Sequence, residues 1–234
     1  MKRFYTLAST KKSEGGFDIL LDGKAVRTPF KNILRSPSEN LAHEIVREWA
    51  VQEEMIVPDT MPLTQILSTK IDKIPQDRVH MTEVMLKYLN TDLLCYRAVD
   101  PPEMAAAQNA AWDPVLQWFE EHFGAKLETT TSLIALEQEP QIHKTVKALI
   151  DSLGQDRFTV LQVVTPLAGS IILALAMVEE HLNAQQVFEC CHVEERFKAA
   201  IYNEEKYGPD PAQEKKDRAM TIDLEAAQRY LELL

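Results

Sequence analysis

The sequence predicts an α+β protein, in which a small N-terminal α/β domain (residues 1–100) is followed by an all-helical C-terminal domain (residues 101–234). Short apolar runs separated by turn residues fill residues 3–36, as expected for an antiparallel sheet. Apolar residues at helical spacing dominate the rest of the chain. Between the two predicted domains, Asp100-Pro101-Pro102 is the clearest linker signal in the sequence.

The predicted sheet begins with Phe4–Leu7, which a Gly15-Gly16 turn separates from a second strand at Phe17–Leu21. Asp22-Gly23 is a strong hairpin signal and leads into a returning strand. The run Asp92–Arg97 is expected to add a last strand to the same sheet. Such a small sheet is not stable alone, so helices must cover one of its faces.

The first covering helix is expected to begin at Ser36, with Ser36 as its cap and Pro37 at its first position. Asp113 and Pro114 form a similar start signal, and Asn183 with Gln186 matches a capping box. Further helices are expected at about residues 63–71, 76–89, 103–123, 140–153, 156–181, 184–206 (ended by Gly208-Pro209) and 211–233.

The composition and the missing motifs exclude several classes of function. The 234 residues include 25 Lys and Arg against 36 Asp and Glu, a net charge of −11, which argues against nucleic acid or an anionic membrane surface as partner. The glycines build no phosphate-binding loop, and no nucleophile elbow or zinc-protease motif is present. These absences remove the commonest phosphate-binding, hydrolase and zinc-protease sites, and we expect no cofactor and no metal site.

Two further observations concern cysteines and the most apolar segment. An odd cysteine count, with two of the three adjacent, is not a disulfide framework and favours a reducing compartment. The longest unbroken apolar run, residues 171–178, is far shorter than the ~20 residues of a membrane span. We therefore expect a buried helix there and no membrane insertion.

Glu194 is the residue whose position most needs an explanation. The helix predicted over residues 184–206 has an apolar stripe, and Glu194 falls within about 40° of its centre, whereas Glu195 falls on the polar side. A carboxylate on an apolar face must be paired, must extend to solvent or must meet a partner. A salt bridge to a neighbouring helix and a binding surface both remain possible. The stripe consists of Val187, Cys190, Val193, Phe197 and Ile201.

An ordered set of short segments resembles one known family. The main segments are Lys2-Arg3-Phe4-Tyr5, Leu21-Asp22-Gly23-Lys24, Glu48-Trp49, Met61-Pro62-Leu63-Thr64, Thr91–Arg97, and Gln108 with Trp112-Asp113-Pro114. In order and spacing, this set resembles the ATP synthase assembly chaperones of mitochondria and alpha-proteobacteria, which bind the alpha subunit of the catalytic head. The resemblance is dense from residue 2 to about residue 120 and thinner to about residue 210.

The late signature of this family is an acidic pair before an aromatic residue, then Trp-Gly and an Asp. It corresponds here to Glu194-Glu195 before Phe197, then Tyr202-Asn203, then Tyr207 and Asp210. This chain departs from the pattern where Tyr202-Asn203 replaces Trp-Gly and Lys198 replaces Gln. By position, the family's functional acidic residue carries over to Glu194 or Glu195, and both stay candidates for client binding.

The resemblance implies a chaperone that holds an unassembled alpha subunit until the beta subunit replaces it. It also implies no enzymatic activity; we expect a monomer in the bacterial cytoplasm, or in the mitochondrial matrix if the source is eukaryotic. Two alternatives stay open. One is an adaptor that binds a helical protein through residues 211–234, and the other is an enzyme using Asp72, Asp92 and Glu194 in an interdomain cleft.

Overall fold

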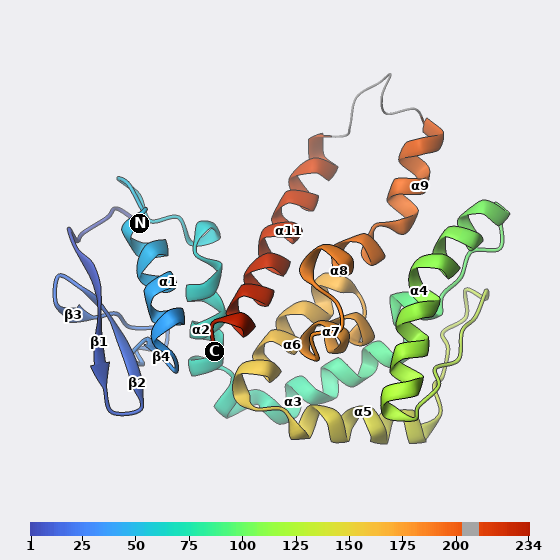
Figure 1. The fold of residues 1–234 in the computed structure, drawn as a ribbon, viewed down its shortest axis with the longest axis horizontal. Coiled ribbons are helices and arrows are strands. Elements are labelled where there is room, and N and C mark those ends of the chain that lie inside the picture. The colour runs from blue at the N-terminus through green and yellow to red at the C-terminus, as the bar shows by residue number, and fades with distance from the viewer. Residues whose placement is uncertain (203–210) are drawn as a thin grey trace. The chain divides into compact units, whose positions relative to one another are not determined.

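The computed structural model describes residues 1–202 and 211–234 and confirms the predicted α+β class (Figure 1). The chain forms two compact units, which we call the first unit (Met1–Arg78 with Ala226–Leu234) and the second unit (Val79–Glu225). The whole sheet lies in the first unit, and the second unit is built from helices. The two units part within α3 (Ile74–Lys87), whereas the domain boundary near residue 100 stays a prediction from sequence.

Strand β2 is the centre of the sheet, since it pairs antiparallel with each of the other three strands. Gly16 begins β2 with a φ of +146°, and a Cβ there would lie 2.2 Å from the Ser36 carbonyl oxygen, so only glycine fits. The strands are β1 (Ala8–Ser13), β2 (Gly16–Leu21), β3 (Lys24–Ala25) and β4 (Arg35–Ser36).

The predictions of two strands are wrong, in each case because a carboxylate accepts hydrogen bonds from backbone N–H groups. At Phe4–Leu7, the N–H groups of Thr6 and Leu7 donate to the Asp22 carboxylate, and β1 begins one residue later. The run Asp92–Arg97 belongs to the second unit and forms a short 3-10 helix, η3 (Leu93–Cys95). There the Asp92 carboxylate accepts from the N–H groups of Leu94 (3.1 Å) and Ile172 (3.2 Å).

Two helices complete the core of the first unit, α1 (Glu39–Ala50) and α2 (Pro62–Asp72). Ser38, and not Ser36, caps α1, because the Leu41 N–H donates to Ser38 Oγ at 3.1 Å. The start of α2 has no cap from its own preceding residue. Instead, the Glu48 carboxylate of α1 caps α2 by accepting hydrogen bonds from the N–H groups of Leu63 (2.7 Å) and Thr64 (2.8 Å).

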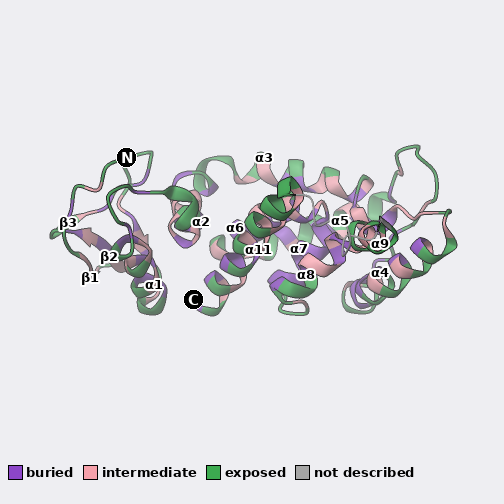
Figure 2. Ribbon diagram, turned by 90° about the horizontal axis from the view of Figure 1, so that it is seen from above, coloured by how far each residue is buried: buried purple, intermediate pink, exposed green. Residues whose placement is uncertain are grey.

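The second unit packs around α7 (Ile171–Val178), all eight residues of which are buried (Figure 2). Two short 3-10 helices, η1 (Pro58–Thr60) and η2 (Tyr88–Asn90), and the long helix α11 (Pro211–Glu232) complete the described elements. None of the helices within residues 1–202 and 211–234 combines the length and hydrophobicity that crossing a membrane requires. The remaining helices are α4 (Pro102–Phe123), α5 (Pro140–Ser152), α6 (Gln155–Ala168), α7 (Ile171–Val178), α8 (Ala184–Cys191) and α9 (Val193–Tyr202).

Two long predicted helices are each divided in the structure. The helix expected over 156–181 ends at Gly169, which adopts the left-handed conformation, and Ser170 then caps α7 by accepting from the Leu173 N–H. The helix expected over 184–206 changes direction at His192. The capping box of Asn183 and Gln186 is confirmed. The predicted stop at Gly208-Pro209 lies outside the described residues.

Candidate functional site

One face of α4 connects three other segments of the second unit. Gln108 and Trp112 lie one helical turn apart on this face, and both are buried. The Gln108 amide accepts from the Ala98 N–H (2.7 Å) and donates to a Glu194 carboxylate oxygen (2.9 Å). The Trp112 indole N–H donates to the Cys190 carbonyl (2.8 Å). Helix α4 is therefore tied to the segment before it, to α8 and to α9.

Arg97 fixes the segment before α4 against the same face. Its guanidinium donates to the side chain of Asn109 (2.9 Å) and forms an ion pair with Asp113 (2.8 Å). It also lies over the Trp112 ring, 5.2 Å from the centroid. The prediction that Asp113 caps a helix is therefore wrong, because α4 already begins at Pro102 and Asp113 serves the ion pair.

The structure places Glu194 in the first turn of α9, where the helix dipole favours a carboxylate. Its side chain is 40% exposed and contacts two partners, the buried Gln108 amide and the Lys198 ammonium (3.5 Å). The cation is thus on its own helix, and the neighbouring helix supplies an amide. Glu195 is exposed and forms no ion pair in the part of the chain that the structure describes.

The predicted apolar stripe is divided at His192. The buried His192 ring lies between the Phe188 carbonyl (2.9 Å) and the Asp217 carboxylate of α11 (3.1 Å). Val187 and Cys190 of α8 are buried, whereas Val193 and Phe197 of α9 are half-buried and Ile201 is 60% exposed. The apolar stripe is therefore buried along α8, whereas along α9 it forms an accessible apolar surface.

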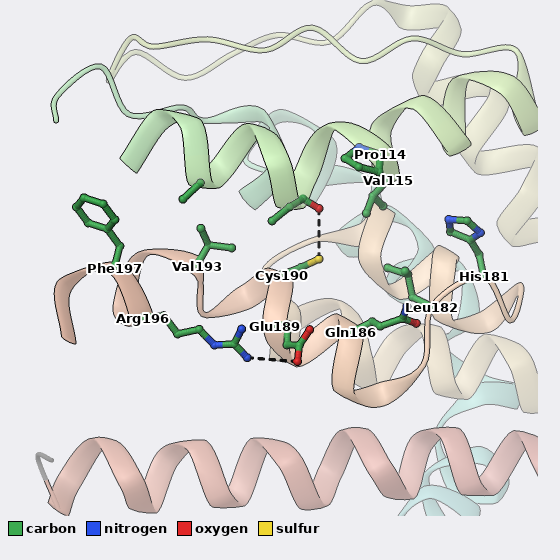
Figure 3. Close-up of a pocket in the computed structure, with 12 residues that line it drawn as sticks. Pro114, Val115, His181, Leu182, Gln186, Glu189, Cys190, Val193, Arg196 and Phe197 are labelled. Atoms are coloured by element: carbon green, nitrogen blue, oxygen red, sulfur yellow. Dashed lines mark hydrogen bonds and ion pairs between the residues drawn. The ribbon is translucent and has the colours of Figure 1, made fainter. Parts of the chain in front are cut away.

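This apolar surface lines a groove of about 520 Å³, which we call the α4–α9 groove. Figure 3 shows Val193 and Phe197 directed toward α4, and the ion pair of Glu189 with Arg196 (3.6 Å) on the side away from α4. The lining residues are Ala107, Ala111, Pro114 and Val115 of α4, His181 and Leu182, Gln186, Glu189 and Cys190 of α8, and Val193, Arg196 and Phe197 of α9.

Sequence reasoning proposed Glu194 as a candidate for client binding but did not predict the groove next to it. The signal that could have indicated a groove is the spacing of Ala107 and Ala111, two small residues one turn apart on α4. Small side chains at this spacing leave room along a helix face that larger residues would fill. Of the late signature, Tyr202 ends α9, while Asn203, Tyr207 and Asp210 lie outside the described residues.

The two units differ strongly in charge. The first unit contains 13 Lys and Arg against 12 Asp and Glu, a net charge of +1, and the second contains 12 against 24, a net charge of −12. The α4–α9 groove therefore belongs to a strongly acidic unit. An apolar groove in such a unit is suited to an apolar surface with basic residues around it.

Two carboxylates of the alternative enzyme hypothesis, Asp72 and Asp92, accept hydrogen bonds that hold the surrounding backbone in place. Asp72, in the first unit, accepts from Thr28 Oγ1 (2.6 Å), the Phe30 N–H (3.0 Å) and Asn32 Nδ2 (2.9 Å) and so holds the turn at residues 28–32. Asp92, in the second unit, holds the start of α7. Across the described residues, no three His, Cys, Asp or Glu side chains are arranged to hold a metal ion.

Comparison with known proteins gives consistent matches. The family model described as ATP12 chaperone protein matches residues 2–120. The mitochondrial protein atp12 of Schizosaccharomyces pombe is 24% identical over 209 residues, which cover 84% of this chain and 72% of that protein. The crystal structure of Atp12 from Paracoccus denitrificans is 32% identical, covers 99% of this chain and 97% of its own, and superposes with a TM-score of 0.87. The crystal structure of Atu1473 from Agrobacterium tumefaciens is 35% identical, covers 99% of this chain and 85% of its own, and superposes with a TM-score of 0.89.

Proposed function

Since the chain belongs to the ATP12 family of ATP synthase assembly chaperones, we propose that it binds the unassembled alpha subunit of the catalytic head and holds it until the beta subunit replaces it. The observation that carries this proposal is the α4–α9 groove beside Glu194 in the acidic unit. An unassembled subunit exposes an apolar interface that aggregates unless something covers it. The groove offers apolar side chains to such an interface, and the acidic unit attracts basic residues around it.

The proposed mechanism is competition for one surface and needs no catalytic step. A chaperone that binds the incomplete subunit lowers the concentration of free, aggregation-prone alpha. The beta subunit then displaces the chaperone because its native interface with alpha is tighter. The protein would act as a monomer, in the compartment where the catalytic head is assembled: the cytoplasm of a bacterium or the matrix of a mitochondrion.

Within this proposal, Glu194 has two roles, and Glu195 has one. Glu194 orients the start of α9 through Gln108, and its remaining exposed surface faces the client. Glu195 is exposed on the same turn and adds negative charge to the client surface. Reversing the charge at either position should therefore weaken binding, and Glu194 should be the more sensitive of the two.

We expect Glu194→Lys to reduce capture of the alpha subunit about tenfold or more, which corresponds to about 1.4 kcal/mol or more of binding free energy. The lysine would lie beside the Gln108 amide hydrogens and Lys198, so it both loses a hydrogen bond and adds repulsion. The measurement is co-purification of alpha with the tagged protein from cells that also express alpha and beta from the same organism, singly and together.

Three further variants make this measurement decisive. Glu194→Gln removes the negative charge but keeps an acceptor for Gln108. A loss of capture in this variant would therefore be due to the missing charge and not to a missing hydrogen bond. Glu120→Lys makes the same charge change on an exposed residue of α4 outside the groove and should capture alpha normally. Urea denaturation of each variant separates loss of binding from loss of folding. Failure of the wild-type protein to capture alpha would refute the proposal, and so would captured alpha that the beta subunit cannot displace.

The adaptor hypothesis is less well supported by the contacts of α11. The sequence predicts an apolar face on this helix made of Ile222, Ala226, Tyr230 and Leu233, and the last three of these side chains are buried within the chain. Ile222 alone of that predicted face is substantially exposed, at 41%. A helix whose apolar face is already packed has little left to offer to a second helical protein.

A further inference from the structure

A second groove lies entirely within the first unit, and the α4–α9 proposal makes no use of it. It has a volume of about 510 Å³ and lies between residues 26–30 and α2. Its apolar lining includes Leu34, Ile56 and Met61, all buried, and Phe30, which is 58% exposed. We call it the Trp49 groove, because Trp49 of α1 is one of the residues that line it.

The indole N–H of Trp49 is a buried, unsatisfied donor. The residue is 9% exposed, and its indole N–H has no hydrogen-bond partner within residues 1–202 and 211–234. The ring is held in place by Tyr5, which packs edge-on at 5.8 Å and donates its hydroxyl hydrogen to the Trp49 carbonyl. A buried donor without an acceptor destabilises the protein, so a ligand that supplies a carbonyl oxygen would remove this cost.

The charged residues of the groove favour an anionic occupant. Arg27 and Lys73 both line it and are exposed, and neither forms an ion pair with a carboxylate of the described chain. The guanidinium of Arg27 donates only to the Lys31 carbonyl (2.8 Å). Asp72 also lines the groove, but its carboxylate is taken up by Thr28, Phe30 and Asn32. Two cations are thus available in a protein whose net charge is −11.

We propose that the Trp49 groove binds an apolar peptide segment that carries acidic side chains. The Trp49 indole N–H would donate to a backbone carbonyl of the peptide, and Arg27 and Lys73 would pair with its carboxylates. Apolar side chains of the segment would pack on Leu34, Ile56 and Met61. This site goes beyond the proposed function, because its charge preference is opposite to that of the α4–α9 groove and it lies in the other unit.

The test compares two synthetic peptides with the same apolar centre and opposite charge, acetyl-SELFLES-amide and acetyl-SKLFLKS-amide, by isothermal titration calorimetry with the full chain. We expect the acidic peptide to bind at least tenfold more tightly than the basic one. Lys73→Glu should remove or reverse this preference, since it reverses one of the two cations. Lys24→Glu makes the same charge change on an exposed residue of the first unit outside the groove and should leave the preference intact.

Trp49→Phe tests the hydrogen bond separately from the charge. It should weaken binding of the acidic peptide about threefold or more and leave the preference for acid unchanged. The thermal unfolding midpoint of each variant shows whether it is folded, and Lys73→Glu, on an exposed side chain, keeps the test valid if Trp49→Phe unfolds. Equal affinity for the two peptides, binding of neither peptide, or an equal effect of Lys24→Glu and Lys73→Glu would overturn the proposal.

Discussion

Replacing Trp112 by alanine is expected to lower the free energy of unfolding by about 3–5 kcal/mol, the range for removing a large aromatic side chain from a core. Trp112 is 1% exposed, and it joins α4 to α8 through its hydrogen bond to the Cys190 carbonyl. The substitution removes the packing of the ring, the stacking partner of Arg97 and the hydrogen bond to the Cys190 carbonyl. Urea denaturation followed by circular dichroism measures the loss.

Trp112→Phe separates the hydrogen bond from the packing. It keeps most of the ring but leaves the Cys190 carbonyl without its indole donor, so we expect a loss of about 1–3 kcal/mol. Because the α4–α9 groove is lined by residues of both helices, this variant should also weaken capture of the client. A Trp112→Phe protein as stable as the wild type would mean that the hydrogen bond contributes nothing to joining α4 and α8.

The second large effect is a pH dependence that originates from Asp92. Burial raises the pKa of Asp92 from 3.8 to about 6, although hydrogen bonds from Ser170 and from the N–H groups of Leu94, Ile172 and Ile171 act in the opposite direction. Between pH 3.8 and about 6, the folded protein therefore keeps a proton that the unfolded chain has released. The folded state binds more protons in this window, so its stability falls as the pH rises through it.

We expect this group to make the protein about 2–3 kcal/mol less stable at pH 7 than at pH 4, since each pKa unit corresponds to about 1.36 kcal/mol. Other carboxylates titrate in the same range, so the informative quantity is the difference between the wild type and Asp92→Asn, which cannot titrate. Urea denaturation at both pH values gives this difference. If the two proteins show parallel pH dependence, Asp92 does not carry the effect.

Much of the fold could be predicted because its signals are local. The hairpin at Asp22-Gly23, the capping box at Asn183 and the spacing of apolar residues along the helices each depend on neighbours in sequence. The wrong predictions arose where a distant group decided the outcome. The run after Asp92 has the composition of a strand, but the Asp92 side chain reaches α7, 80 residues further along the chain.

The candidate site shows the same division. The helical wheel singled out Glu194 as a carboxylate that needs a partner, and the structure gives it a hydrogen bond from Gln108, 86 residues away in the sequence. The wheel assumed one continuous helix, however, and the change of direction at His192 is accompanied by a contact with Asp217 that no local pattern indicates. The α4–α9 groove depends on how two helices meet, so residue types on either helix alone could not define it.

The return of residues 226–234 to the first unit has a consequence for synthesis of the chain. Ser38, the cap of α1, donates to the Leu233 carbonyl, and Glu44 of α1 pairs with Arg229 (3.4 Å). A ribosome makes the sheet and α1 well before it makes residues 226–234, which pack against them. The first unit therefore cannot complete its core until residues 226–234 have been made. A chaperone built in this way has a period of incomplete burial during its own synthesis.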